Sequence, residues 1–312
     1  MTTLPSTTTP TRKLSRNRFW SERTLTIVLF LLPTLAFMGI FVVWPILNSL
    51  QLSLYEWNGI DPNRTFVGVT NWARLVQDAV FWQALGNNLI IVVLSIAIQL
   101  PIAMLLAVML ERSRGFFSKF FKTVYFFPML MSSVAVGILF KYIYDPSFGL
   151  VNAALTNIGL GNLTQSWLGE PRWALLSVIL VICWQFIPFY MILFYAALNA
   201  VPGELKDAAR IDGAGDARYY RFIALPLVMG TVRTAIILSL IGSLKYFDLV
   251  WVMTEGGPNN ASELMATYMY KKAFPSFEVG YGSTVAFAMF VFVMLVSLLA
   301  LGLGRRLDWR NT

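Results

Sequence analysis

Residues Glu204-Leu-Lys-Asp-Ala-Ala-Arg-Ile-Asp-Gly213 form a polar stretch that continues through Ala214 to Leu225-Pro226. It is the longest polar passage with helical character in a chain that is 57% hydrophobic. Apolar stretches long enough to cross a membrane flank it on both sides. A short charged helix between two membrane spans needs a surface to contact, so its side of the membrane decides how the chain is organised.

The composition is typical of a membrane protein. Charged residues make up 13% of the chain and the mean hydropathy is +0.65, whereas an average soluble domain carries about 25% charged residues. The net charge of +8 is typical of basic loops on the cytoplasmic side, so no nucleic-acid partner is expected. The single cysteine, Cys183, lies inside an apolar stretch, and the chain has no histidine. These facts argue against a disulfide framework, a metal site and histidine-based catalysis.

Six apolar stretches each have about the ~20 residues that a membrane-crossing helix needs. They lie at about 25–44, 89–110, 124–144, 173–198, 231–251 and 283–304. Because a bilayer core offers no water to bind backbone groups, such stretches must be helical. The first is longer than the apolar region of a typical signal peptide and no clear A-x-A site follows it, so we expect it to be retained. The sequence therefore predicts an all-α, polytopic protein that crosses the lipid bilayer about six times.

The basic residues indicate the orientation. Of the 24 lysines and arginines, most lie in segments assigned to the inner side. The outer ones are Arg64, Arg74, Arg172, Lys271 and Lys272, and Lys141 and Lys245 lie within spans. The positive-inside rule then places both termini and the polar segment 199–226 in the cytoplasm. We expect a disordered basic tail at 1–23, a transmembrane domain at 24–304 and a second cytoplasmic tail at 305–312.

The outer segments are each too short for a separate globular domain. In the last of them, about 252–282, Ser262 and Glu263 precede an apolar-rich run to Phe274. This pattern predicts an N-capped helix that Pro275 ends. We expect this helix to lie at the outer membrane surface.

The polar segment has a helical pattern of its own. Pro202 and Glu204 suit the start of a helix, and Gly213 suits a sharp turn at its end. The apolar face holds Val201, Leu205, Ala208 and Ala209, and the charged face holds Lys206, Asp207 and Arg210. On this pattern alone, a helix lying in the membrane interface remains an alternative to a helix docked in a protein groove. The alanines favour the groove, because small side chains let another backbone approach closely.

The spacing of this segment resembles a known motif. Asp207-Ala208-Ala209 is followed after three residues by Gly213, and after nine more by Ile223-Ala-Leu225-Pro226. This arrangement resembles the EAA loop of ABC-importer permeases, with Asp207 in place of the usual glutamate. The longer sequence from Val201 to Ala214 resembles the carbohydrate-uptake branch of that family.

The resemblance extends over about residues 25–304. Its further motifs are Phe66-Val-Gly-Val-Thr-Asn71, Phe81-Trp82, Tyr144-Asp-Pro-Ser-Phe-Gly149 with Asn152, Phe247-Asp248, Met253-Thr-Glu-Gly-Gly-Pro258, Tyr268, Tyr270, Ala273-Phe274 and Gly280-Tyr281. It implies the fold of a type I ABC importer permease in the inner membrane of a bacterium or archaeon. Such a permease pairs with a second, similar permease, and a separate extracytoplasmic binding protein delivers the solute. Each permease docks its EAA helix into a cleft on a cytoplasmic ABC ATPase dimer, whose ATP-driven closure switches the pathway.

For this chain, the resemblance implies that the coupling helix contacts the ATPase through five residues. They are Glu204 and Asp207 as charged contacts, Ala208 and Ala209 as the close-approach surface, and Gly213 as the turn. The chain has no GxxxxGK[ST] phosphate loop, so ATP and Mg²⁺ are expected on the partner ATPase subunits. We therefore expect no cofactor, no metal and no catalytic residue in this chain.

Polar residues inside the apolar stretches are few, and they are candidates for the solute pathway. The candidates are Trp184, Gln185, Tyr190, Ser243, Tyr246 and Asp248, and Gln99, Asn199 and Ser239 are further polar residues within or beside the stretches. Aromatic rings stack on the apolar faces of a sugar, and amides or hydroxyls bond its hydroxyl groups. Alternatively, the aromatic and small residues only pack the helices, and Lys245 pairs locally with Asp248, three residues away.

Two other functional classes are weighed against the importer. An ion-coupled secondary transporter would normally carry acidic or histidine relays within its spans, and Asp248 is the one clear acid there. An intramembrane enzyme would need a nucleophile with a base, or a metal motif such as HExxH, and the sequence has neither a histidine cluster nor that motif. Within the importer class, a glycerol phosphate or another polar solute remains an alternative to a sugar or oligosaccharide.

Overall fold

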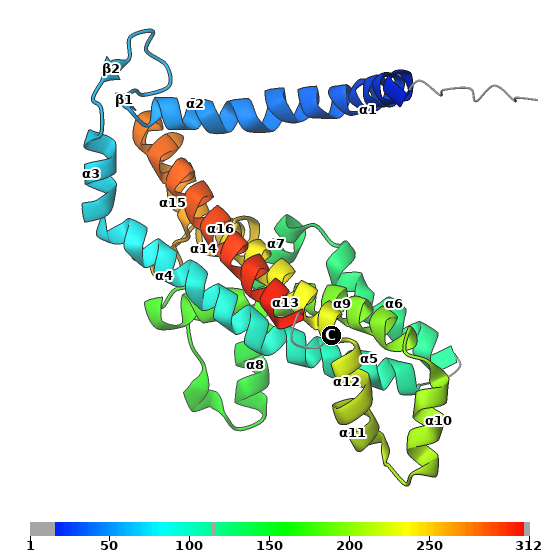
Figure 1. The fold of residues 1–312 in the computed structure, drawn as a ribbon. Coiled ribbons are helices and arrows are strands. Elements are labelled where there is room, and N and C mark those ends of the chain that lie inside the picture. Colours follow the sequence, from blue (N-terminus) through cyan, green and yellow to red (C-terminus); the bar gives the residue numbers. More distant parts are fainter. Residues whose placement is uncertain (1–15, 114–115, 309–312) are drawn as a thin grey trace, which may run out of the picture. The chain divides into compact units, whose positions relative to one another are not determined.

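The structure of the protein, a computed structural model, describes residues 16–113 and 116–308 (Figure 1). The chain divides into two compact units, residues 1–51 and residues 52–312. Helices dominate both units and the only strands in the described ranges are two residues long, so the predicted all-α class is confirmed.

The first unit is a helical stretch interrupted by one π-helical turn. It consists of α1 (Arg16–Met38), η1 (Gly39–Val43) and α2 (Trp44–Leu52), whose last residue belongs to the second unit. The part Thr24–Leu52 is long and apolar enough to cross a membrane. Because α1 starts at Arg16, it includes the end of the tail that was expected to be disordered. Residues 1–15 of that tail lie outside the described residues.

The second unit holds a two-stranded sheet and the other helices. Strand β1 (Tyr55–Glu56) pairs antiparallel with β2 (Thr65–Phe66). The helices up to the end of the fourth apolar stretch are α3 (Thr70–Gln77), α4 (Ala79–Leu94), the π-helical η2 (Ser95–Gln99), α5 (Leu100–Arg112), α6 (Phe116–Leu130), α7 (Ser133–Ile143), α8 (Leu150–Asn157), the 3₁₀ turn η3 (Gly161–Leu163) and α9 (Pro171–Asn199). The later ones are α10 (Gly203–Ile211), α11 (Asp216–Tyr219), the π-helical η4 (Tyr220–Ala224), α12 (Leu225–Leu227), α13 (Met229–Leu244), α14 (Asp248–Thr254), α15 (Met265–Ala273) and α16 (Val279–Asp308).

The candidate membrane spans differ in shape from the sequence prediction, and their number depends on how bent helix pairs are counted. In the described part of the chain, four helical stretches are long and apolar enough to cross a membrane. The number becomes six if each of two bent helix pairs counts as one span. The second span begins earlier than expected, at Ala79, and α16 continues to Asp308, inside the expected tail 305–312. Residues 309–312 lie outside the described residues.

The third apolar stretch is not one straight helix, as the sequence predicted. Helices α6 and α7 meet at an angle of 102°. Pro128 lies in the last turn of α6, where it cannot donate a backbone hydrogen bond. Ser132 then caps the new helix, because its hydroxyl accepts from Val134 N at 3.3 Å. The stretch therefore forms two short helices with a capped break.

The prediction of a fifth span over 231–251 is wrong at both ends. The helical path starts at α11, bends by 70° between α12 and α13, and ends at Leu244. Asn88 of α4 donates to the carbonyl oxygens of Ser243 and Leu244 at 3.2 and 3.3 Å, so these carbonyls have partners outside their own helix. Asp248 then starts a separate helix, α14.

Helix α9 is the central helix of the second unit. It packs against α5, α6, α13 and η2, and buried side chains lie along most of its length. A helix that is apolar all round belongs in the middle of a bundle. Figure 1 shows α4 and α5 running along the same bundle, and η2 joins them end to end. The polar segment with α10 and α11 lies at one end of this bundle.

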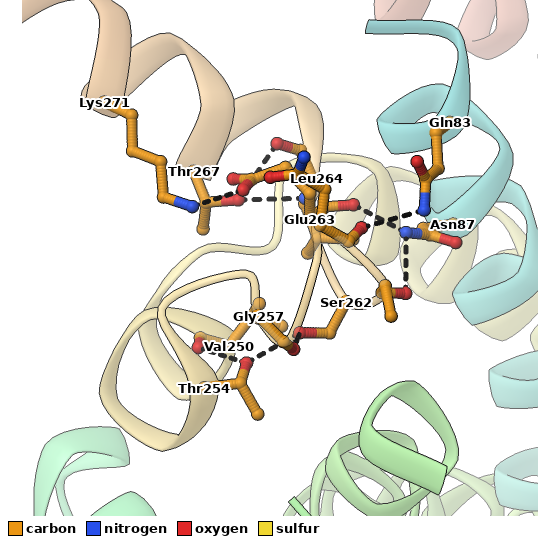
Figure 2. A network of polar contacts seen from close by, with 12 residues as sticks. Gln83, Asn87, Val250, Thr254, Gly257, Ser262, Glu263, Leu264, Thr267 and Lys271 are labelled. Atoms are coloured by element: carbon orange, nitrogen blue, oxygen red, sulfur yellow. Dashed lines mark hydrogen bonds and ion pairs between the residues drawn. The ribbon is translucent and has the colours of Figure 1, made fainter. Parts of the chain in front are cut away.

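The segment before α15 is held by a network of polar contacts (Figure 2), in addition to the apolar packing of Leu264. The helix expected from Ser262 exists, but its N-cap residue is Leu264, and Thr267 Oγ1 accepts from Leu264 N at 2.9 Å. Ser262 donates to Gly257 O at 2.6 Å, inside the loop. The predicted serine cap is therefore wrong, because the serine closes the loop instead of starting the helix.

Candidate functional site

Helix α10 forms where the sequence predicts a short polar helix. Pro202 precedes it in an extended conformation and Glu204 lies in its first turn, where a negative charge suits the helix dipole. At its end, Gly213 has a φ of +75°, and Ala214 N donates to Ala209 O at 2.8 Å. Such a left-handed glycine is the usual way to turn a chain sharply out of a helix.

One face of α10 contacts the protein's own helices. Ala209 is 4% exposed and belongs to the same buried cluster as Leu110 and Tyr219. Lys206 lies on this face too, with its Nζ 2.9 Å from Oε1 of Glu111 at the end of α5. The expectation that Lys206 shares an outer charged face with Asp207 is therefore wrong, and Ala209 is not at the surface.

The opposite face of α10 is exposed. It presents the charged side chains of Glu204 and Asp207 together with Ala208, and the turn at Gly213 is exposed as well. Ile211 is 87% exposed although it is apolar. Four of the five predicted coupling residues thus lie at the surface, and only Ala209 points into the bundle.

A cavity of about 330 Å³ lies among η2, α9 and α13 and the residues next to them. Its lining is Gln99, Met129, Ile182, Phe186, Phe189, Tyr190, Leu238, Ser239, Gly242, Ser243 and Tyr246. The structure therefore brings together three predicted pathway residues, Tyr190, Ser243 and Tyr246. The hydroxyl of Tyr246 is buried and has no hydrogen-bond partner among the described residues. A buried donor of this kind is available to a polar ligand.

The other three predicted pathway residues do not line this cavity. Trp184 is 40% exposed and packs edge-on against Phe140, with ring centroids 5.2 Å apart. Gln185 is buried and donates from Nε2 to Met131 O at 3.3 Å, at the break between α6 and α7. Asp248 is exposed at the start of α14, and the described residues show no ion pair between it and Lys245.

The sequence carried a signal for the cavity residues that were not selected. Ile182, Phe186 and Tyr190 are four residues apart, and so are Ser239 and Ser243, so each set lies on one helix face. Gln99 belongs to a different span, and only the packing of η2 against α9 brings it close. Spacing can find the faces, but it cannot tell which two faces meet.

Several motif residues outside the cavity hold the fold. Asp145 Oδ1 accepts from Ser147 N and Phe148 N at 2.8 and 3.1 Å, which closes the turn before α8. Asn152 Oδ1 accepts from Trp167 Nε1 at 2.8 Å. These motif positions are explained by local structure and need no ligand.

A further polar cluster joins the start of α4 to α15 and α16. Asp78 caps α4 by accepting from Val80 N at 2.9 Å, and it also accepts hydrogen bonds from the hydroxyls of Tyr268 and Tyr281. Burial alone would raise the pKa of Asp78, but the bonds from Tyr268, Tyr281 and the backbone outweigh it and lower the pKa below its usual value. Burial and these bonds raise the pKa of Tyr268.

No group of three or more histidine, cysteine or acidic side chains that could hold a metal ion occurs among the described residues.

Comparison with known proteins gives a consistent result. The family described as "Binding-protein-dependent transport system inner membrane component" matches residues 99–311. The Probable ABC transporter permease protein YurN of Bacillus subtilis is 38% identical over 272 residues, which cover 87% of this chain and 93% of that protein. The Lactose transport system permease protein LacF of Rhizobium radiobacter is 36% identical and covers 87% and 91%.

The fold has a solved counterpart. A chain in the crystal structure of a bacterial ABC transporter involved in the import of alginate matches with a TM-score of 0.81 over 93% of this chain and 99% of that one. The two sequences are 24% identical, so this likeness concerns the fold. The resemblance seen in the sequence is confirmed, and the chain belongs to the family of binding-protein-dependent transport system inner membrane components.

Proposed function

We propose that this chain is a transmembrane permease subunit of an ATP-driven ABC importer and forms, with a second permease, the pathway for a sugar or oligosaccharide. An extracytoplasmic binding protein delivers the solute, and a cytoplasmic ABC ATPase dimer, which binds ATP and Mg²⁺, drives its transfer. The chain itself binds no nucleotide. Both termini and α10 lie in the cytoplasm, in agreement with the distribution of basic residues.

The observation that carries the solute class is the lining of the cavity. Its polar groups are hydroxyls and one amide, and its aromatic groups are Phe186, Phe189, Tyr190 and Tyr246. This combination suits a neutral, polyhydroxylated solute, because rings stack on sugar faces while hydroxyls and amides bond to hydroxyl groups. Among the lining residues none is charged, so a glycerol phosphate would find no cationic partner there. Relatives named for lactose, diacetylchitobiose and multiple sugars point the same way.

The exposed face of α10 supports the coupling role. Glu204, Asp207 and Ala208 lie side by side on it and have solvent rather than protein above them. The side chains of Glu204 and Asp207 make no ion pair with the described residues, so they remain available to basic groups of an ATPase cleft. A charged face with an alanine beside the charges lets a partner backbone come close.

The test is transport by the assembled complex in proteoliposomes, with ATP inside, the binding protein outside and a panel of neutral sugars plus glycerol 3-phosphate. Vanadate-sensitive uptake of one or more sugars is expected. Ala208→Arg should abolish uptake and co-purification of the ATPase while leaving membrane insertion intact. Ala209→Arg would not be informative, because Ala209 is buried and its replacement by arginine would disrupt the bundle.

The cavity has its own test. Tyr190→Ala should raise the transport Km for the sugar about tenfold, the amount that corresponds to the loss of one aromatic contact and one hydrogen bond. Trp184→Ala is the matched control, because Trp184 lies on the same helix but outside the cavity. Uptake of glycerol 3-phosphate alone, or uptake that responds to ionophores and not to vanadate, would contradict the proposed function.

A further inference from the structure

Glu111, at the end of α5, is the centre of a polar cluster that includes Lys206 and Tyr220, here called the Glu111 cluster. Lys206 Nζ lies 2.9 and 3.2 Å from the two carboxylate oxygens of Glu111, and the hydroxyl of Tyr220 donates to the same carboxylate. Lys206 Nζ is also 3.5 Å from the hydroxyl of Tyr220. Three separate helical segments, α5, α10 and η4, therefore meet at one carboxylate.

The Glu111 cluster is partly shielded from water and lies at the wall of a polar pocket that Arg112, Arg210 and Asp216 also line. The side chains of Lys206 and Glu111 are each 20% exposed. The rings of Tyr219 and Tyr220 lie near the ammonium group, with both centroids 5.6 Å from Nζ. A charge pair in such a site is screened less than one at the surface, and removal of one partner leaves the other poorly solvated.

A second ion pair nearby gives a comparison. Arg112, the next residue of α5, pairs with Asp216 of α11 at 2.9 Å, but their side chains are 56% and 33% exposed. Exposed pairs contribute little, because water and salt compete for both charges. The same end of α5 thus carries one shielded contact to α10 and one exposed contact to α11.

The position of Glu111 links α10 to the cavity. The covalent chain already joins α10 to α9 on one side and, through α11, η4 and α12, to α13 on the other. Helix α5 is far from α10 in the sequence, because Glu111 and Lys206 are 95 positions apart, so the two helices are joined by side-chain contacts and not by a short connection. Helix α5 continues η2, whose Gln99 lines the cavity about 18 Å from Glu111 along the helix.

We infer that Glu111 is a positioning residue that makes α5 move together with α10, so that a displacement of α10 by the ATPase changes the cavity at Gln99. This inference rests on the proposed function. The shielded pair with Lys206 and the bond from Tyr220 hold α5 against both ends of the polar segment. Without them, α5 is joined to α10 only by apolar packing, directly between Leu110 and Ala209 in their buried cluster and through α9, so α5 follows the displacement of α10 less closely. ATP hydrolysis then continues while fewer solute molecules cross for each ATP.

The experiment measures sugar uptake and ATP hydrolysis in the same proteoliposomes, with the full complex and the binding protein. Glu111→Gln keeps the shape of the side chain and removes its charge. It should lower the uptake per ATP hydrolysed about fivefold, a change typical of one residue that couples two sites. The exchange Glu111→Lys with Lys206→Glu restores the opposite charges and should recover most of the loss, because the Tyr220 hydroxyl lies near both positions.

Arg112→Gln is the matched control on the same helix and should change uptake per ATP by less than about twofold. An unchanged ratio in Glu111→Gln, an equal loss in Arg112→Gln, or no recovery in the double exchange would overturn the inference. So would loss of the ATPase from the Glu111→Gln complex, because Glu111 would then act only by folding α10. Absence of ATP-dependent sugar uptake by the unaltered complex would instead contradict the proposed function.

Discussion

The loop 255–264 and helix α10 are both polar, but their polar groups have different partners. In the loop, Ser262 and Glu263 are fully buried, and the amide of Asn87 donates to Ala261 O and Glu263 O at 3.1 and 2.9 Å (Figure 2). On α10, Glu204 and Asp207 remain exposed, and their charges have no ion-pair partner in the described ranges.

This difference indicates two uses of polar residues in one membrane protein. The loop uses them to satisfy its own backbone, so its shape is fixed by this chain alone. Helix α10 keeps one polar face for the bundle, through Lys206, and leaves the other without a partner. The loop thus finds most of its polar partners within this chain, although Glu263 Oε1 has none among the described residues, whereas the exposed face of α10 is available to another subunit.

The largest expected effect concerns two amides of α4, one with buried and one with exposed bonds, which extends the contrast between buried and exposed polar groups beyond the loop and α10. Asn88 is fully buried, donates to the carbonyls that end α13, and accepts from Met265 N at 3.0 Å. Asn88→Leu leaves Leu244 O and Met265 N without their partner, removes one of the bonds to Ser243 O, and should lower the free energy of unfolding by about 4 kcal/mol. Gln83→Leu removes one exposed bond to Asn260 O and should cost below about 1 kcal/mol. Unfolding in mixed detergent micelles measures both, and equal losses would contradict the contrast.

A buried charge gives the next largest effect. Lys271 pairs with the carboxylate of Glu263, which is completely buried. Lys271→Met leaves that carboxylate without its cation and should destabilise the protein by about 3 kcal/mol. Lys272→Met is the control, because Glu278 keeps Arg74 as a second partner at 2.6 Å, and should cost below about 1 kcal/mol. Melting temperatures of the two purified variants compare the effects, and a larger loss in Lys272→Met would be inconsistent with a structural role of Glu263.

A comparison of two glycines with similar backbone angles separates the cost of backbone strain from the cost of steric crowding. Gly256 in the loop and Gly213 after α10 have φ values of +78° and +75°. A Cβ at Gly256 would collide with the carboxylate of Glu263, whereas a Cβ at Gly213 meets nothing within 4 Å. Gly213→Ala should therefore cost about 1 kcal/mol of backbone strain, and Gly256→Ala about 2 kcal/mol more. Thermal unfolding of the variants measures the difference, and similar costs would show that the loop is not tightly packed.

The smallest effect is a dependence on pH. Hydrogen bonds lower the pKa of Asp78 in the folded protein, so Asp78 contributes stability above its unfolded-state pKa of about 4. This contribution is lost as the pH falls through the lower, folded-state pKa. Asp78→Asn should therefore be less stable than the unaltered protein at pH 7 and should lose less stability between pH 5 and acidic pH, as pH-dependent unfolding can measure. Parallel acid curves for the two proteins would exclude the role of these bonds.

The helical class, the number of about six spans and the position of α10 were predictable from the sequence alone. The class and the number of spans follow from the lengths of the apolar stretches, because such a stretch can cross the bilayer only as a helix. The turn at Gly213 depends on local backbone chemistry, which the residue type reveals. Breaks such as the one after Leu244 were not predicted, because they depend on Asn88, which is far away in the sequence.

The residues of the candidate site, too, were only partly predictable from the sequence. Tyr190, Ser243 and Tyr246 were found from the sequence because polar groups in apolar helices are rare, but Gln185 carried the same signal and instead bonds to the break at Met131. Sequence determined which helix faces carry hydroxyls, rings and charges, since that follows from periodicity within one element. Only the tertiary structure decided that Ala209 and Lys206 face inward and that Glu111 joins α5 to α10. Contacts between distant segments depend on how whole helices pack, and no local pattern contains that information.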